Sequence, residues 1–224
     1  NFKLISIEEC LEQSIDVAIF SAGKDISLKW APIFSRKDIT VIDNSSAWRM
    51  DDRKKLIIPE INGNELCEND KIIANPNCST IQMLIALAPL HKKYGITRII
   101  VSTYQSVTGT GRIALNQLNN EYNKIRGEMA YNYQIHQNAI PQCDDFEDNG
   151  YTKEEMKLIN ETHKILDPKI SITATAVRVP VIGGHSESIN LTLEKDFDIQ
   201  QIKELLSSSK GIKLEDDPKS FKYP

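Results

Sequence analysis

The stretch Lys71-Ile72-Ile73-Ala74-Asn75-Pro76-Asn77-Cys78-Ser79-Thr80 organises the interpretation of the whole chain. It is typical of a short buried strand, followed by a tight polar turn and a cysteine at the start of a helix. We expect Ser79 or Thr80 to cap this helix, because both side chains can accept hydrogen bonds from backbone N–H groups. The helix should end near Gly95.

Cys78 occupies a position at which a thiol can become nucleophilic. Unpaired backbone N–H groups and the positive end of the helix dipole both favour the thiolate over the thiol. The alternative is a buried cysteine that packs as a small hydrophobe, which is the commoner role of a cysteine. The Asn75-Pro76-Asn77 turn and the start of the helix favour the nucleophile.

The segment before this stretch predicts a parallel α/β sheet. Nearly continuous apolar runs indicate parallel strands buried on both faces, and we expect them at residues 14–20, 39–43, 55–60 and 71–74, with a helix at about 25–36. Ser21-Ala22-Gly23, Asn44-Ser45-Ser46 and Asn75–Cys78 follow strands, so they should line one ligand-binding edge. No glycine precedes Gly23, so either the fold binds no dinucleotide or the first βαβ unit is missing from this chain.

The pattern changes to α+β from Thr97 onward. A long strand is predicted at 97–107, and alternating residues predict two further strands on either side of Gly183-Gly184-His185, paired as an antiparallel hairpin. Helices are predicted after Gly111, with an apolar face of Leu118, Tyr122 and Ile125, and from residues 152 and 198, with a capping box in the former.

Composition excludes several classes of protein. The 224 residues carry a net charge of −4, which argues against nucleic acid as a partner. No apolar run approaches the roughly 18 residues that cross a bilayer, so we expect no membrane partner. Four cysteines without close pairs indicate a reducing compartment, such as the cytoplasm, or a plastid if the source is a plant. We expect no metal site, because no Cys-x-x-Cys or histidine cluster is present.

His185 is the best candidate for a proton-transfer partner of the thiol. The other three histidines fall at the far end of the Cys78 helix, in an acidic loop and within a helix. A lone histidine in a turn is more often a solvated polar residue. Arg178 lies seven residues earlier, however, and both side chains could bind one small anion.

Four further polar residues have an ordinary interpretation and a functional one. Glu161 and Lys164 share a helix face, which is usually a surface ion pair. Arg49 could bind two oxygens of a phosphate or carboxylate, or be a surface arginine. Gln105 would ordinarily be an edge-strand residue.

Taken together and in this order, these segments resemble the aspartate-β-semialdehyde dehydrogenase family. The resemblance covers nearly the whole chain. The segments that carry it are 20–23 (Phe-Ser-Ala-Gly), 43–50 (Asp-Asn-Ser-Ser-Ala-Trp-Arg-Met), 58–62 (Ile-Pro-Glu-Ile-Asn), 75–80 (Asn-Pro-Asn-Cys-Ser-Thr), 103–107 (Thr-Tyr-Gln-Ser-Val), 161–165 (Glu-Thr-His-Lys-Ile), 178–181 (Arg-Val-Pro-Val) and 184–187 (Gly-His-Ser-Glu).

The resemblance implies an NADP-dependent enzyme that interconverts L-aspartate-4-semialdehyde plus phosphate with L-aspartyl-4-phosphate, on the route to lysine, methionine and threonine. It implies the following roles: Cys78 as nucleophile, His185 as general acid/base and Gln105 as the residue that orients the intermediate; Arg178 for the substrate carboxylate and Glu161 for its amino group; Arg49, Lys164 and Asn77 for phosphate; and Ser21, Ala22, Gly23 and Gly109 for the cofactor.

The resemblance also implies the organisation of the chain. We expect residues 1–76 to be the remainder of an NADP-binding Rossmann-like domain whose first βαβ unit is missing. Residues 77–224 would form a catalytic and dimerisation domain with a mixed or antiparallel sheet, incomplete at its C-terminus. A homodimer or a dimer of dimers is expected. Thr108-Gly109-Thr110-Gly111 departs from the family's Ser-Gly-Ala-Gly but keeps both glycines.

Three alternatives fit less well. N-acetyl-γ-glutamyl-phosphate reductase usually has its cysteine in a Gly-Cys-Tyr context, and glyceraldehyde-3-phosphate dehydrogenase has Ser-Cys-Thr-Thr-Asn, whereas this chain has Asn77-Cys78-Ser79. A non-catalytic interaction domain that reuses the fold would have no reason to keep Cys78, Gln105, Arg178 and His185 together.

Overall fold

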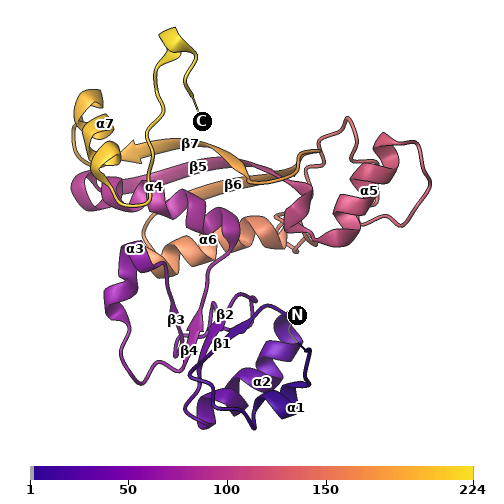
Figure 1. Ribbon diagram of the computed structural model, residues 1–224. Helices are drawn as coiled ribbons and strands as arrows, with labels where there is room; N and C mark the ends of the chain where they lie inside the picture. The colour runs from indigo at the N-terminus through magenta and orange to yellow at the C-terminus, as the bar shows by residue number, and fades with distance from the viewer. Residues whose placement is uncertain (1–2, 224) are drawn as a thin grey trace. The chain divides into compact units, whose positions relative to one another are not determined.

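A computed structural model describes residues 3–223 (Figure 1). The chain divides into two compact units, Asn1–Ile81 and Gln82–Pro224. Each unit has its own sheet, and the helix α4 (Cys78–Tyr94) begins in the first unit and continues into the second.

The first unit contains a four-stranded parallel sheet with strand order β1-β2-β4-β3. The parallel α/β architecture predicted from the apolar runs is confirmed. The elements of this unit are α1 (Ile7–Cys10), β1 (Val17–Phe20), α2 (Lys24–Arg36), β2 (Thr40–Asp43), β3 (Lys55–Leu56), α3 (Pro59–Asn62), the 3₁₀ turn η1 (Gly63–Glu65) and β4 (Ile72–Ala74).

The predicted strand at 55–60 is wrong beyond Leu56. Pro59 opens the short helix α3, where its fixed backbone angle suits the first helical position. The Asn62 side chain closes this turn, because it accepts from the Ile58 N–H and donates to the Leu56 carbonyl.

The core of the first unit lies where α2 packs on the sheet. Trp30, Ala31 and Phe34 from the helix form a cluster with Val41 and Ile72 from the strands. The prediction that these strands are buried on both faces is wrong for the described residues. Ile19 on the edge strand β1 is 77% exposed, because its side chain lies outside this cluster.

The second unit contains a three-stranded mixed sheet with order β6-β5-β7. The central strand β5 (Ile96–Gln105) pairs in parallel with β6 (Ser171–Arg178) and antiparallel with β7 (Ser186–Leu193). The predicted hairpin between β6 and β7 is therefore wrong. β6 and β7 instead pair with opposite edges of β5 along almost their full length. The backbone groups of β5 are thereby hydrogen-bonded on both sides.

The remaining elements of the second unit are helical. They are the 3₁₀ turn η2 (Val107–Gly109), α5 (Arg112–Tyr122), α6 (Lys153–Ile165), α7 (Ile199–Ser208) and the 3₁₀ turn η3 (Pro218–Ser220). Figure 1 shows α6 along one face of the sheet, where it contacts β6. The predicted caps at Thr152 and Asp198 are confirmed.

The predicted apolar face of α5 is only partly correct. Leu118 is buried, but Tyr122 is 70% exposed and Ile125 lies beyond the end of the helix. Polar side chains instead hold the loop that follows. Gln117 accepts from the N–H groups of residues 130 and 131, and Glu121 accepts from those of residues 135 and 136.

The start of α6 is tied to β6 through a buried capping box. The Thr152 hydroxyl accepts from the Glu155 N–H at 3.4 Å and donates to the Glu155 carboxylate at 2.8 Å. The other Glu155 oxygen accepts from the Ala176 N–H in β6 at 3.0 Å. The cap therefore sets the position of the helix against the sheet.

We predict that Thr152→Ala lowers the free energy of unfolding by about 1–2 kcal/mol, because it removes a helix cap and leaves buried groups unpaired. Thr152→Ser, which keeps the hydroxyl, should stay within about 0.5 kcal/mol of the original protein. Urea denaturation followed by circular dichroism measures both values. An alanine variant as stable as the serine variant would contradict the assigned role of the cap.

Candidate functional site

The polar segments of the first unit meet at the carboxyl-terminal edge of its sheet. Asn75 donates to the Asn44 side chain at 2.9 Å, and Asn44 donates to the Ser21 hydroxyl at 3.4 Å. The buried guanidinium of Arg49 donates to the backbone carbonyls of Asn75 and Asn44, both at 2.9 Å. Arg49 therefore joins the loops that follow β2 and β4.

Cys78 is exposed and is the first residue of α4. The predicted cap at Ser79 or Thr80 is wrong, because both residues lie buried inside the first turn. The Asn77 side chain supplies the cap, since its oxygen accepts from the Ser79 N–H at 2.9 Å and from the Thr80 N–H at 3.4 Å. The thiol thus lies at the positive end of a long helix, as the sequence predicted.

The loop between β1 and α2 leaves the start of α2 open. Gly23 precedes the first residue of α2 with φ +94°, and no side chain caps this helix. A Cβ atom placed on Gly23 would have no atom within 4 Å, so the approach to the helix start is open. Ser21, Ala22 and Gly23 are all exposed there, where backbone N–H groups can bind an anion.

The second unit brings His185, Arg178 and Gly109 together. The Ser106 N–H donates to Nδ1 of His185 at 3.0 Å, and Nη1 of Arg178 donates to the Ser106 carbonyl at 2.7 Å. A Cβ atom on Gly109 would lie 3.2 Å from Nη1 of Arg178 and 3.3 Å from Cε1 of His185. Both side chains therefore pack closely against Gly109.

The environment of His185 favours its neutral form. Burial lowers the pKa of the imidazole below its usual value, and the positive charge of Arg178 lowers this pKa further. The carboxylate of Glu154 and a hydrogen bond with the Gly184 backbone oppose these effects. A neutral ring at pH 7 can accept a proton as a general base.

Gln105 is buried in the central strand, so its interpretation as an edge residue is wrong. Its amide donates to Glu154 at 2.9 Å, and the Thr103 hydroxyl donates to its oxygen at 3.4 Å. Lys157 in turn donates to Glu154 at 3.0 Å. These bonds fix the carboxamide of Gln105 at the end of β5, opposite Arg178 in β6.

Glu161 and Lys164 lie three residues apart on α6. Glu161 is only 1% exposed, which overturns its interpretation as half of a surface ion pair. A carboxylate is rarely buried to this degree unless it is paired, so a structural or binding role is indicated.

A cavity of about 280 Å³ lies beside Arg178, and sequence reasoning missed it. Its walls include Tyr131, Gln142 and Cys143. Nε of Arg178 is buried and has no hydrogen-bond partner among the described residues. Burial raises the pKa of the Cys143 thiol to about 11, so Cys143 is protonated at neutral pH and is no nucleophile.

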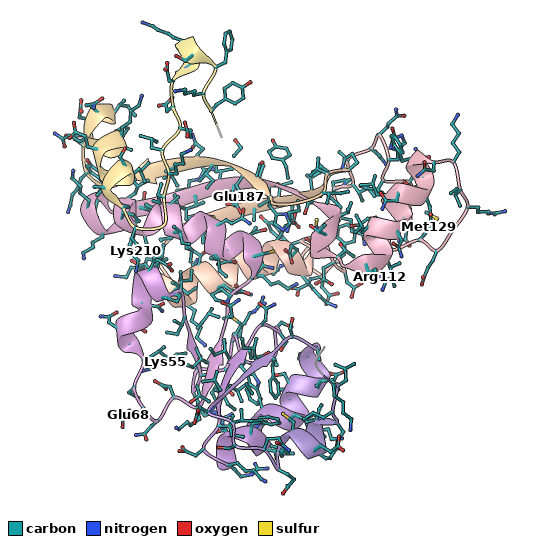
Figure 2. The ribbon with its side chains drawn as sticks, in the orientation of Figure 1. Lys55, Glu68, Arg112, Met129, Glu187 and Lys210 are labelled. Atoms are coloured by element: carbon teal, nitrogen blue, oxygen red, sulfur yellow. The ribbon has the colours of Figure 1, made fainter. Side chains whose placement is uncertain are left out.

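Sequence reasoning also missed Glu187. Glu187, labelled in Figure 2, lies on β7. It pairs with Thr103 of β5, and burial raises its pKa to about 7. One of its carboxylate oxygens has no hydrogen-bond partner in residues 3–223. The sequence did contain a signal for this burial. Side chains alternate between the two faces of a strand, and Glu187 falls on the same face as the inward residues Ile189 and Leu191.

Two of the other histidines have structural partners. Nδ1 of His91 accepts from the Ile96 N–H at 3.0 Å, just after α4, and Nε2 of His163 lies 2.8 Å from the Ile170 carbonyl. Across the described residues we find no group of His, Cys, Asp and Glu side chains arranged to hold a metal ion. The helices of residues 3–223 also include none with the length and apolar character of a membrane span.

We predict that Arg178→Gln raises the pKa of His185 toward its usual value, because a positive charge that disfavours the imidazolium is removed. A pH titration of the His185 ring by NMR measures this change. Arg98→Gln provides the control, since Arg98 lies at the other end of β5. An unchanged or lowered pKa in Arg178→Gln would contradict the assigned electrostatics.

We predict that Gly109→Ala lowers turnover by roughly tenfold, because Arg178 and His185 must each move away from the added Cβ by a few tenths of an ångström. Gly184→Ala is the matched control, since its Cβ would meet no atom within 4 Å. Steady-state rates of the two variants decide the matter, and equal rates would show that the Gly109 contact has no role.

Comparison with known proteins identifies the family of the chain. Residues 2–69 match the family model "Semialdehyde dehydrogenase, NAD binding domain", and residues 87–224 match "Semialdehyde dehydrogenase, dimerisation domain". Aspartate-semialdehyde dehydrogenase of Bacillus subtilis is 44% identical over 238 residues, which cover 98% of this chain and 68% of the relative. The Aquifex aeolicus enzyme is 45% identical over 95% of this chain and 65% of the relative.

Solved structures give the same result. Aspartate semialdehyde dehydrogenase II of Vibrio cholerae, in complex with ASA, superposes with a TM-score of 0.87 at 44% identity, covering 93% of this chain and 65% of that one. The chain thus spans about two-thirds of the length of the relatives that it matches. It belongs to the aspartate-semialdehyde dehydrogenase family.

Proposed function

We propose that the protein catalyses the reversible, NADP-dependent conversion of L-aspartyl-4-phosphate to L-aspartate-4-semialdehyde and phosphate. The observation that carries this proposal is an exposed thiol at the capped start of a long helix. The chain that contains it is about 45% identical to proteins named aspartate-semialdehyde dehydrogenase. The whole protein would thereby serve the synthesis of lysine, methionine and threonine.

Cys78 is the proposed nucleophile. In the direction of oxidation, its thiolate adds to the aldehyde carbon, the C=O π bond opens and the oxygen takes up a proton, which gives a thiohemiacetal on Cys78. The cofactor for which Ser21, Ala22 and Gly23 are proposed contacts would, when bound as NADP⁺, supply the hydride acceptor needed to oxidise this adduct to a thioester. Phosphate then attacks the thioester carbonyl, the C–S bond breaks, and Cys78 leaves as thiolate.

His185 is the proposed proton carrier for these steps. Its lowered pKa supports a neutral ring at pH 7, which takes the proton of the thiohemiacetal hydroxyl as the thioester forms. In the biosynthetic direction the same ring returns the proton to the oxygen. Gln105, held by Glu154 and Thr103, is proposed to orient the intermediate on Cys78.

Charged side chains are proposed to bind the two ends of the substrate. Arg178 would bind the α-carboxylate, which is supported by its buried Nε and by the cavity beside it. The buried Glu161 would bind the amino group. Arg49 and Lys164, together with Asn77, would bind phosphate, although part of the Arg49 guanidinium already holds backbone carbonyls.

Cofactor binding and assembly complete the proposal. Ser21, Ala22 and Gly23 would contact NADP at the open start of α2, and Gly109 would contact it from the second unit. Residues 1–76 would be part of the NADP-binding domain, and residues 77–224 would serve catalysis and dimerisation. The dimerisation-domain match over residues 87–224 supports a homodimer.

We predict that Cys78→Ala lowers phosphate-dependent NADPH formation from aspartate semialdehyde by roughly 10³-fold or more, because no nucleophile remains. His185→Gln should retain a measurable rate, lowered by roughly 10²-fold. Absorbance of NADPH in the full-length protein measures both rates. Cys67→Ala is the matched control, since Cys67 is also an exposed thiol but lies outside the proposed site.

Normal turnover by Cys78→Ala would contradict the proposed mechanism. A protein that turns over neither aspartate semialdehyde nor its longer N-acetylated homologue would be a binding module instead. Alkylation of Cys78 separates these cases further, because substrate should protect Cys78 in an enzyme and have no effect on Cys67.

A further inference from the structure

Lys157 in α6 bonds two carboxylates that belong to different parts of the candidate site. Its ammonium donates to Glu154, three residues earlier on the same helix face, at 3.0 Å, and to Asp144 in the preceding loop at 2.9 Å. Glu154 is buried and accepts from the Gln105 amide at 2.9 Å. Asp144 lines the same cavity as Arg178. One lysine therefore contacts both the support of Gln105 and the wall of the Arg178 cavity.

Both ion pairs of Lys157 are partly shielded from water. The side chain of Lys157 is 26% exposed, and those of Asp144 and Glu154 are 37% and 9% exposed. Burial alone would lower the pKa of the ammonium, but the charge of Glu154 and the hydrogen bonds with both carboxylates outweigh it and raise the pKa of Lys157. Lys157 is therefore a cation at neutral pH, and salt screens its pairs less than it screens pairs on the surface.

The charge of Glu154 decides which end of the Gln105 carboxamide faces it. An ionised carboxylate only accepts hydrogen bonds, so the amide nitrogen of Gln105 must point toward it. A buried carboxylate that loses its cation tends to take up a proton, and a protonated carboxyl group can also donate. The oxygen of Gln105 would then be an equally good partner, and the carboxamide would be able to turn over. Lys157 therefore favours a single orientation of Gln105.

The same cation keeps a negative charge away from Arg178. Nε of Arg178 is buried and has no hydrogen-bond partner within residues 3–223, so this donor is available to a carboxylate. Asp144 lies on the wall of the same cavity, but its carboxylate bonds Lys157. Once released from Lys157, that carboxylate would be attracted by Arg178 and would compete there with a carboxylate ligand.

We propose that Lys157 is a positioning residue that acts through these two ion pairs. Its bond to Asp144 keeps that carboxylate away from Arg178, which should lower the KM for the substrate. Its bond to Glu154 holds the Gln105 carboxamide in one orientation, which should raise kcat. These effects on turnover rest on the function proposed above, whereas the effects on the two side chains do not.

The first test is Lys157→Met in the full-length protein, assayed by NADPH formation from aspartate semialdehyde. KM should rise roughly tenfold, because Asp144 competes for Arg178, and kcat should fall roughly tenfold, because Gln105 is misoriented. Lys157→Met/Asp144→Asn should bring KM back to within about twofold of the original while kcat stays low, since asparagine carries no charge. Lys157→Arg, which can bind both carboxylates, should restore both constants.

The matched control is Lys153→Met. Lys153 lies one turn earlier on α6 and bonds Asp145, which also lines the cavity, at 2.6 Å. The two side chains are 48% and 76% exposed, so this pair is weak, and both constants should stay within about twofold of the original. Unchanged constants in Lys157→Met, the same changes in Lys153→Met, or a KM that Asp144→Asn does not correct would each overturn the proposal.

NMR of side-chain N–H groups tests the proposal without turnover. The Nε–H signal of Arg178 should shift in Lys157→Met and return in Lys157→Met/Asp144→Asn, and the amide signals of Gln105 should broaden or split. Arg178→Gln and Gln105→Ala assign these signals. Signals that do not move in Lys157→Met would overturn the proposal. An original protein that is inactive toward aspartate semialdehyde would refute the proposed function, while these signals would still decide the role of Lys157.

Lys157→Gln keeps the proposal testable if Lys157→Met does not fold. Its amide can still donate to a carboxylate but carries no charge, so KM should rise and kcat should fall several-fold, with the same shift of the Arg178 signal. A Lys157→Gln variant that matches Lys153→Met in all three measurements would overturn the proposal.

Discussion

The second unit depends on the pairing of one strand, β5, with neighbours on both of its edges. Its parallel register with β6 places Gln105 opposite Arg178, and its antiparallel register with β7 places Tyr104 opposite Ser186, next to His185. Residues far apart in the sequence therefore meet at one end of the sheet. Because side chains alternate along a strand, a slip of one residue in either register would turn Arg178 or Glu187 to the other face.

A second constraint is local and lies at the start of α4. The Asn77 side chain takes the N–H groups of Ser79 and Thr80, which fixes where the helix begins and leaves Cys78 exposed at its first position. The same chain holds another thiol, Cys143, whose burial raises its pKa to about 11. The two thiols therefore differ in exposure and in their position relative to a helix, which are the features that control the reactivity of a cysteine.

Burial of polar groups is the common theme of the second unit. Gln105, Glu161 and Arg178 are all nearly inaccessible, and each would destabilise the fold unless its polar atoms were bonded. Networks such as Gln105–Glu154–Lys157 meet this requirement and also fix side-chain positions. Rigid placement of polar groups is the property that a catalytic site needs, since it avoids reorganisation during the reaction.

The sequence by itself determined the parallel sheet of the first unit, the helix caps at Thr152 and Asp198 and the position of a thiol at a helix start, because these follow from local patterns of three to ten residues. It also carried the family resemblance, which the comparisons confirm. Tertiary structure alone decided that β7 pairs with β5 instead of β6, that Glu187 is partly buried and that Ser106 contacts His185. The physical reason is that strand order and burial arise from contacts between distant segments, which local propensity does not encode.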